Sequence, residues 1–469
     1  MPMNFDFSEE SRREIWSFLH QQLEAYYAHT ADRPVAPPLE PAAIRNYLHT
    51  SFQQALPAEQ ALRHVLDGLD RYLVHTPHPN YYGLFNPRAA FPGILADTIT
   101  ATYNPQMAAW SHAPFAVEVE NLLVQTFGTR FGWQKESCDG VFTSGGAEAN
   151  LTAVQTALNH VFPHYASKGI RGAEGQPVLY CSAESHHSLL KAARVSGLGL
   201  EGVRALPVNE RLELMPEQVE AQLEQDLQQG KRPFMLAATM GTTGAGAFDP
   251  LGRLAALAKK WGLWLHADAA YGGALALSPQ HQYLLQDLHL ADSITFDAHK
   301  WMSLPMGTSM YLTRHPRILD ASFRTTADYM PKEASQLDIT DPFTHSIQWS
   351  RRFNGLKVYL ALLMLGWEGY REVIEQQIRV GQCLKDELQK SGWLLYNDTP
   401  LPIACFGKPH FAQNEGAALA LSQQLIQSGQ AWISVYRIGG INSLRACITN
   451  YATTEAHVRE TVALLNSLV

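Results

Sequence analysis

The first 80 residues carry the hydrophobic period of helices and no alternation typical of strands. Apolar side chains recur three or four positions apart within residues 8–28, at Ile15, Leu19, Leu23 and Tyr26. A second helix is expected over residues 58–73, and the Pro-rich stretch 33–41 predicts an extended linker between the two. Because helices joined by an extended arm bury little surface alone, we expect residues 1–80 to pack on another domain or subunit.

From about residue 140, short runs of β-forming residues alternate with helical stretches. The runs are Val178–Cys181, Phe234–Ala238, Leu263–His266, Ser293–Phe296 and Thr308–Leu312. This alternation predicts a mainly parallel sheet covered by helices on both faces, so we assign residues 81–350 to a large α/β domain. A long helix from Leu356, strands near 403–406 and 443–448, and a helix from Thr454 predict a small α+β domain over residues 351–469.

Two of the predicted strands lead to groups of opposite charge. Leu263–His266 runs on to Asp268, and Ser293–Phe296 runs on to Lys300. About 30 residues separate the two groups, which is the length that a strand, a helix and a parallel strand need. An acid and an amine can therefore emerge at one sheet edge, where cofactors bind. An amine that forms Schiff bases, facing a carboxylate that can pair with a pyridinium nitrogen, is the arrangement of pyridoxal phosphate enzymes.

A glycine turn and a histidine add to this edge. Residues 141–150 read as a strand, a turn on Gly145 and Gly146, and a helix start, where free amides can bind a phosphate. An ordinary strand-to-helix turn is the alternative, and neither a GxGxxG nor a Walker motif is present. His186 follows another strand and could stack on a flat cofactor, although it could also be an ordinary surface or core histidine. Adjacent histidines point to different faces, so we expect no metal at His186 and His187.

The composition is that of a globular enzyme, with 46% hydrophobic and 17% charged residues. The net charge of −8 gives no attraction to nucleic acid or anionic membranes, so neither is an expected partner. Five widely spaced cysteines argue against a disulfide framework or zinc cluster and favour a reducing cytoplasm. We expect no signal peptide, and the longest apolar stretch, Val358–Trp367, is too short for the ~20 residues of a membrane span.

Five segments occur in the order and spacing of the pyridoxal phosphate-dependent amino-acid decarboxylases. They are Ser144-Gly-Gly-Ala-Glu-Ala-Asn150, Ser185-His-His-Ser188, Gly241-Thr-Thr-Gly244, His266-Ala-Asp-Ala-Ala-Tyr271 and Asp297-Ala-His-Lys-Trp301. From about His78 to Thr454 the chain resembles the branch that includes the aromatic-L-amino-acid, glutamate, cysteine sulfinate and diaminobutyrate enzymes. The resemblance implies a fold type I enzyme with a mainly parallel seven-stranded sheet. It also implies pyridoxal 5'-phosphate as cofactor, an L-amino-acid substrate, and a homodimer with active sites at the subunit interface.

The resemblance assigns roles to individual residues. Lys300 forms the Schiff base with the cofactor, and Asp268 pairs with the ring nitrogen. His186 stacks on the ring, and Ala270 lies under its other face. The carbon dioxide of the substrate leaves, and the electrons flow into the ring against Asp268.

The same resemblance implies a phosphate site. The groups expected around the phosphate are the backbone amides of Gly145, Gly146 and Ala147, with Thr242 and His299 nearby. Family members usually have a phosphate-binding side chain three residues before the lysine. Here Asp297 takes that place, and this acid could hydrogen-bond through its backbone or share a proton.

The family also has a mobile loop that carries a tyrosine, which protonates the carbanion in the partner subunit's active site. Tyr329, in the polar stretch 325–341, matches it, with a plain surface loop as the alternative. In similar enzymes that make aldehydes a phenylalanine replaces this tyrosine. Its presence here favours simple decarboxylation to the amine.

The substrate side chain is harder to predict. In similar enzymes the segments 81–88 and 104–110 line the substrate pocket, the second from the other subunit. Aromatic-specific members carry bulky apolar groups where this chain has Leu84, Gln106 and Ala108, which disfavours an aromatic substrate. Arg88 could attract an acidic side chain, but the interpretation we favour is an exposed arginine on a loop.

Three functions are compatible with these residues. The first is a homodimeric amino-acid decarboxylase. The second is another enzyme on the same fold, such as an aminotransferase or an aldehyde-forming oxidative decarboxylase. The third is a non-catalytic cofactor-binding protein, against which the joint presence of Lys300, Asp268, His186 and Tyr329 argues.

Overall fold

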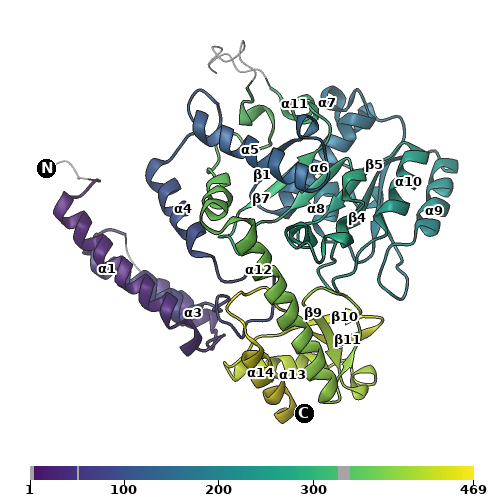
Figure 1. Cartoon of the computed structure of the whole chain (residues 1–469). Helices are drawn as coiled ribbons and strands as arrows, with labels where there is room; N and C mark the ends of the chain where they lie inside the picture. The colour runs from purple at the N-terminus through teal and green to yellow at the C-terminus, as the bar shows by residue number, and fades with distance from the viewer. Residues whose placement is uncertain (1–4, 50–51, 326–338) are drawn as a thin grey trace.

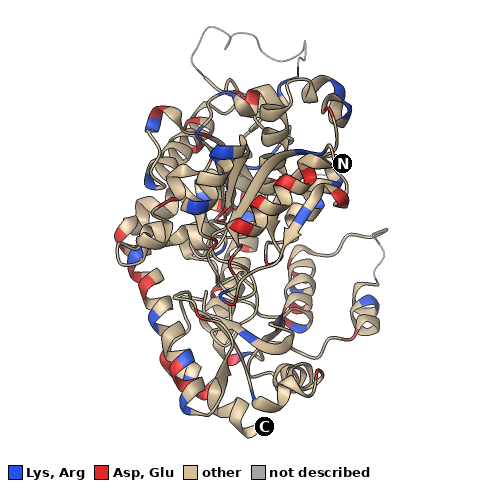
Figure 2. Cartoon of the chain, turned by 90° about the vertical axis from the view of Figure 1, so that its right-hand side faces the viewer, with Lys and Arg blue, Asp and Glu red and all other residues tan. Residues whose placement is uncertain are grey.

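The computed structural model of the chain describes residues 5–49, 52–325 and 339–469. A helical arm projects from a large α/β domain and a smaller α+β domain, and the long helix α12 runs from the large domain to the small one (Figure 1). In Figure 2 the ribbon positions of Lys and Arg (blue) and of Asp and Glu (red) are interspersed over both domains.

The large domain is built on a seven-stranded sheet with the order β1-β7-β6-β5-β4-β2-β3. The strands are β1 (Asp139–Thr143), β2 (Pro177–Ser182), β3 (Val203–Leu206), β4 (Arg232–Thr239), β5 (Trp264–Asp268), β6 (Ser293–Phe296) and β7 (Ser309–Thr313). Strand β7 runs antiparallel to both of its neighbours, and the pairs among β2 to β6 are parallel. The predicted mainly parallel seven-stranded α/β sheet is confirmed.

Helices cover both faces of this sheet because its strands are apolar on both faces. Within β2, Val178 and Tyr180 belong to one buried cluster, and Leu179 and Cys181 belong to another. The first cluster includes residues of α5 (Pro114–Arg130), α9 (Pro216–Gln228), α10 (Leu251–Trp261) and the start of α12 (Gly355–Lys390). The second includes residues of α6 (Gly146–Val161), α8 (Ser188–Val195) and α11 (Ile318–Phe323). The remaining helices of this domain are α4 (Phe91–Tyr103) and α7 (Tyr165–Lys168).

The small domain is an antiparallel four-stranded sheet backed by helices. Its strand order is β10-β11-β9-β8, with β8 (Leu394–Leu395), β9 (Ile403–Gly407), β10 (Ser434–Ile438) and β11 (Ile441–Cys447). The helices α13 (Ala417–Gln427) and α14 (Glu455–Ser467) contribute to its core with the second half of α12. Within α12, Gly366 has φ 63°, a left-handed conformation that interrupts the helix and that glycine adopts easily.

The arm contains α1 (Glu9–Ala28), α2 (Pro41–Leu48) and α3 (Ala58–Tyr72), and none of these helices contains a buried residue. The two predicted arm helices are present, and α2 is an additional helix that begins at Pro41, the last residue of the Pro-rich stretch. Two backbone hydrogen bonds fasten this part of the chain to the small domain. Between α1 and α2, Val35 N donates to Gly429 O at 2.7 Å, and after α3, Tyr82 N donates to Trp432 O at 2.9 Å. The arm helices thus leave an apolar surface uncovered.

Candidate active site

The carboxyl ends of the parallel strands bring the predicted acid, amine and imidazole to one edge of the sheet. Asp268 is the last residue of β5 and is 5% exposed. Lys300 follows β6, and its side chain is 19% exposed. His186 follows β2 and lies on the wall of a cleft of about 460 Å³ between the two domains. Ala270 is buried beside Asp268, and its N–H donates to Asp268 Oδ1 at 3.2 Å.

Asn150 on α6 links Asp268 to His186. One N–H of its amide donates to Asp268 Oδ2 at 2.8 Å, and Nδ2 also donates to Ser188 Oγ at 2.7 Å. Ser188 Oγ in turn lies 2.9 Å from His186 Nδ1. Partial burial in the cleft lowers the pKa of His186, which favours the neutral imidazole. Asn150 and Ser188 lie within the motifs that carry the family resemblance, but their roles were not predicted from the sequence.

A second row of hydrogen bonds fixes the orientation of Asn150. Its Oδ1 lies 2.8 Å from Thr295 Oγ1 and 3.0 Å from His266 Nε2. Burial lowers the pKa of His266 to about 4, so this imidazole is neutral. Because Ser293 Oγ already accepts from Trp264 Nε1, its own hydroxyl proton is free to donate to His266 Nδ1. His266 then donates from Nε2, and both N–H groups of Asn150 face Ser188 and Asp268.

Lys300 pairs with the unusual acid Asp297. The Nζ atom lies 3.0 Å from Asp297 Oδ2, and His299 Nε2 lies 3.7 Å from the same oxygen. Ser309 Oγ donates to Asp297 Oδ1 in a short hydrogen bond. Burial alone would raise the pKa of Asp297, but the Lys300 and His299 charges and the hydrogen bonds lower it below its ordinary value. Asp297 is therefore an anion that fixes the Lys300 ammonium group.

The start of α6 lies beside this anion. Gly146 and Ala147 occupy its first turn, where backbone N–H groups have no intrahelical acceptor. A Cβ atom on Gly146 would lie 2.8 Å from Asp297 Oδ2, whereas one on Gly145 would meet no atom within 4 Å. Thr242 is buried, and its hydroxyl accepts from Ala247 N at 3.0 Å within its own loop.

Arg445 on β11 is a site residue that the sequence did not reveal. It lies on the wall of the cleft, and its Nε and Nη1 atoms donate to the carbonyls of Thr243 at 2.9 Å and Gly83 at 2.8 Å. Its Nη2 is buried and has no hydrogen-bond acceptor among the described residues. Lys300 Nζ and the Arg445 guanidinium carbon lie 5.7 Å and 5.0 Å from the centre of the Phe85 ring. A charged residue between the apolar residues Leu444 and Ala446 was the available signal.

The predicted substrate segments have different environments. Leu84 is exposed on the cleft wall, whereas Ala108 is buried. The prediction of an exposed Arg88 is wrong, because this residue is half-buried, stacks on Tyr27 and donates to the Tyr27 carbonyl at 2.6 Å. Arg88 therefore supports the arm. Tyr329 lies outside the described residues.

Residues 41–407 match the family model of the pyridoxal-dependent decarboxylase conserved domain. The chain belongs to this family. It is 29% identical to the acidic amino acid decarboxylase GADL1 of Bos taurus over 369 residues, which are 78% of this chain and 70% of the relative. It is also 26% identical to the aromatic-L-amino-acid decarboxylase of Bacillus atrophaeus over 479 residues, covering 100% of this chain and 97% of the relative.

Solved structures agree with this assignment. The crystal structure of mouse CSAD in apo form has a TM-score of 0.89 at 26% identity, covering 97% of this chain and 99% of that chain. The crystal structure of Oryza sativa TDC with PLP and tryptamine has the same fold, with a TM-score of 0.92 at 22% identity and coverage of 100% and 98%. The protein is thus a carboxy-lyase, a pyridoxal phosphate-dependent amino-acid decarboxylase with the fold type I architecture. In the described part of this decarboxylase, no helix is long and apolar enough to cross a membrane.

The residues at the sheet edge fit pyridoxal phosphate. A buried carboxylate, Asp268, is available for a protonated ring nitrogen, and an amine, Lys300, is available for a Schiff base. The open space at Gly145, next to the amides of the first turn of α6, suits a phosphate. We call this group of residues, Asp268, Asn150, His186, Asp297 and Lys300, the sheet side of the site. Arg445, Leu84 and the β10 residues on the cleft wall form its interface side.

Proposed function

We propose that this decarboxylase holds its amino-acid substrate between Arg445 and Lys300, and releases carbon dioxide and the corresponding amine. The observation that carries the proposal is the buried Nη2 of Arg445, which has no acceptor among the described residues. A buried charged donor without a partner costs about 1–3 kcal/mol or more, and a substrate carboxylate would satisfy it. An arginine that holds the α-carboxylate also fixes the direction in which that group leaves.

On the sheet side, the proposed roles follow from the contacts of each residue. Lys300 would hold the cofactor through Nζ, Asp268 would pair with its ring nitrogen, and His186 would lie against its ring. The amides of Gly145, Gly146 and Ala147 would hold the phosphate, with Thr242, His299 and Asp297 close to it and Ala270 under the ring. When bound, pyridoxal phosphate accepts the electron pair that the departing carboxylate leaves behind. Asn150 keeps Asp268 and His186 in place.

A proton must then return to the α-carbon. We assign this step to the Tyr329 hydroxyl, on the strength of the family resemblance of its segment. The expected product is therefore an amine and not an aldehyde.

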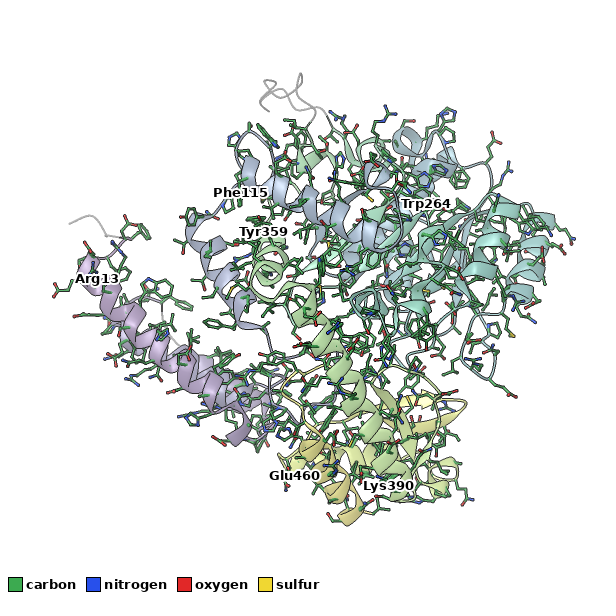
Figure 3. All side chains as sticks on the ribbon, viewed as in Figure 1. Arg13, Phe115, Trp264, Tyr359, Lys390 and Glu460 are labelled. Carbon is green, nitrogen blue, oxygen red and sulfur yellow. The ribbon has the colours of Figure 1, made fainter. Side chains whose placement is uncertain are left out.

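We also propose a homodimer. Exposed apolar residues gather on α4, α5 and α12, and they are Phe91, Ile99, Tyr103, Phe115, Leu122, Leu363, Met364 and Leu365. Phe115 of α5 and Tyr359 of α12 lie beside each other, with ring centres 6.4 Å apart (Figure 3). A second copy would cover this surface and the arm. Light scattering should give twice the mass of one chain, and Leu363→Asp should shift it toward the monomer, whereas Leu419→Asp on α13 should not.

The free state of all five cysteines supports a cytoplasmic location, which we include in the proposal.

The decisive test is a panel assay of the cofactor-loaded protein with aromatic, acidic and basic L-amino acids. Carbon dioxide, amine, aldehyde and keto acid are all quantified. Amine formed one-for-one with carbon dioxide supports the proposal. Aldehyde or keto acid as the main product would instead favour the oxidative or the transaminating reaction, and no product from any amino acid would contradict the proposal.

A further inference from the structure

A carboxylate and a phenol meet across the domain interface at the cleft. Glu184 follows β2, two residues before His186, and Tyr436 lies on β10 of the small domain. The Tyr436 hydroxyl donates a short hydrogen bond to Glu184 Oε2. Both residues line the cleft together with His186 and Arg445. Nothing in the cofactor chemistry requires an acid at this place.

Tyr436 is closely packed and hydrogen-bonded to Glu184, so it sets the position of that carboxylate. Its ring packs so closely on Gly244 that a Cβ atom on this glycine would overlap it. The carbonyl of Gly244 also accepts from Arg445 Nε at 3.0 Å. Burial is the largest cause that raises the pKa of Tyr436, and the hydrogen bond to Glu184 and the charge of Glu184 raise it further. The phenol therefore remains a hydrogen-bond donor. One loop therefore positions the arginine and the tyrosine together.

Glu184 is the acid on the cleft wall, and no other acid occurs among the described residues that line it. Its Oε1 atom has no hydrogen-bond partner in the described part of the chain. Of the cations nearby, Arg445 is assigned to the α-carboxylate and Arg437 is paired with Glu415 at 3.5 Å. No cation among the described residues that line the cleft therefore forms an ion pair with the carboxylate of Glu184.

The remaining wall beside Glu184 is apolar. Leu84, which is 56% exposed, and Val435 line the same cleft. Methylene groups can pack on these side chains, while a terminal cation reaches the carboxylate. An acidic side chain would instead meet Glu184 with like charge.

We propose that Glu184, positioned by Tyr436, selects basic L-amino acids, whose side chains end in an ammonium or guanidinium group. This inference rests on the proposed function, in which Arg445 binds the α-carboxylate. Glu184 is the specificity-determining residue that touches the side chain, and Tyr436 is a positioning residue that acts through Glu184.

The test compares the cofactor-loaded wild type with Glu184→Gln and Tyr436→Phe. L-Lysine and L-ornithine serve as basic substrates, L-glutamate and L-aspartate as acidic ones, and L-tyrosine as an aromatic one. The wild type should prefer a basic amino acid. Glu184→Gln should raise KM for that substrate at least about tenfold with kcat little changed, because a charge-assisted contact is lost while the reacting atoms keep theirs. Tyr436→Phe should raise KM less and leave kcat unchanged.

Glu220→Gln is the matched control. Glu220 lies on α9, accepts hydrogen bonds from Lys260 and Trp261 on α10, and does not line the cleft. The change in cofactor absorbance on mixing with substrate gives a dissociation constant. This constant should rise by the same factor as KM, which shows that the substitution weakens binding and not turnover. Two results would overturn the inference: carbon dioxide from acidic or aromatic amino acids alone, or no change in the KM for basic amino acids in Glu184→Gln. Either result would leave the proposed decarboxylase activity unaffected. Absence of carbon dioxide from every amino acid counts against the proposed function itself.

Discussion

The two sides of the active site differ in how completely their polar groups are paired. On the sheet side, Asp268 and Asn150 are buried, and Asn150 uses both its N–H donors and its oxygen in hydrogen bonds. On the interface side, Arg445 has one nitrogen without an acceptor among the described residues, and Leu84 is exposed. A fully paired network specifies one geometry, whereas unpaired groups at a cleft are available to a ligand. The sheet side is therefore built for a permanent cofactor and the interface side for an exchanging substrate.

The largest effect should come from Lys300→Ala on the sheet side. Without the Nζ atom no covalent link to the cofactor can form, so activity should fall at least about 10⁴-fold. The visible absorbance of the cofactor-loaded protein should disappear after dialysis. Lys259→Ala, at an exposed position on α10, should retain both. Absorbance that survives dialysis of Lys300→Ala would show that another amine holds the cofactor.

The second largest effect should come from Arg445→Gln, which changes the interface side of the site. Loss of a buried partner for the α-carboxylate should lower kcat/KM about 10²-fold for every amino acid that is turned over, while cofactor absorbance remains. Arg459→Gln is the matched control, because Arg459 is exposed on α14, pairs with Glu455 and does not line the cleft. If Arg445→Gln affected one class of side chain and spared the others, Arg445 would contact the side chain and not the α-carboxylate.

The same difference explains which site residues could be predicted from sequence. Asp268 ends the strand β5 and Lys300 lies shortly after the strand β6, so a local pattern and the length of a strand-helix-strand unit place them together. The partner of Arg445 in the site, Phe85, is some 360 residues away in the chain, and no period or spacing links the two. Asn150 is part of a motif that marks the family. Its role depends on the orientation of its buried side-chain amide toward Asp268, Ser188 and His266, which the sequence does not specify.

The fold was predictable where elements are long and apolar on both faces, as in β2, β4 and β5. Strand β3 has only four residues, with a half-buried Arg204 and an exposed Ala205, and β8 has two, so neither produces a recognisable period. Helix α2 begins at Pro41 at the end of a stretch that reads as extended, because proline is tolerated in a first helical turn. The division of the chain at residues 80 and 350 stays a prediction.

Asn150→Ala should destabilise the sheet side by about 2–4 kcal/mol, because Asp268, Thr295 and His266 would each lose a buried hydrogen bond. The urea midpoint of the cofactor-free protein measures this. Asn159→Ala on the same helix is the matched control, since Asn159 is half-buried and its side chain donates to one described acceptor, the Gln155 carbonyl. Equal losses in the two variants would mean that the network adds no more than an ordinary side chain of α6.

The smallest expected effect is a pH dependence that belongs to the sheet side alone. Burial lowers the pKa of His266 to about 4, below the value near 6.5 of the unfolded chain. The folded state thus favours the neutral ring, and this stabilisation is complete above pH 6.5 and is lost as the pH falls toward 4. Between pH 7 and pH 5 the free energy of unfolding should fall by about 1–2 kcal/mol through this group.

His266→Gln removes the titration and can still donate to Asn150, so its urea midpoints should fall less steeply over the same pH range. His20→Gln, on α1 of the arm, should keep the wild-type slope. If His266→Gln also kept that slope, the neutral His266 would not be what orders the hydrogen bonds behind Asp268. The orientation of Asn150 would then be set by Thr295 and Ser188, whose hydroxyl groups contact Asn150 and do not titrate in this pH range.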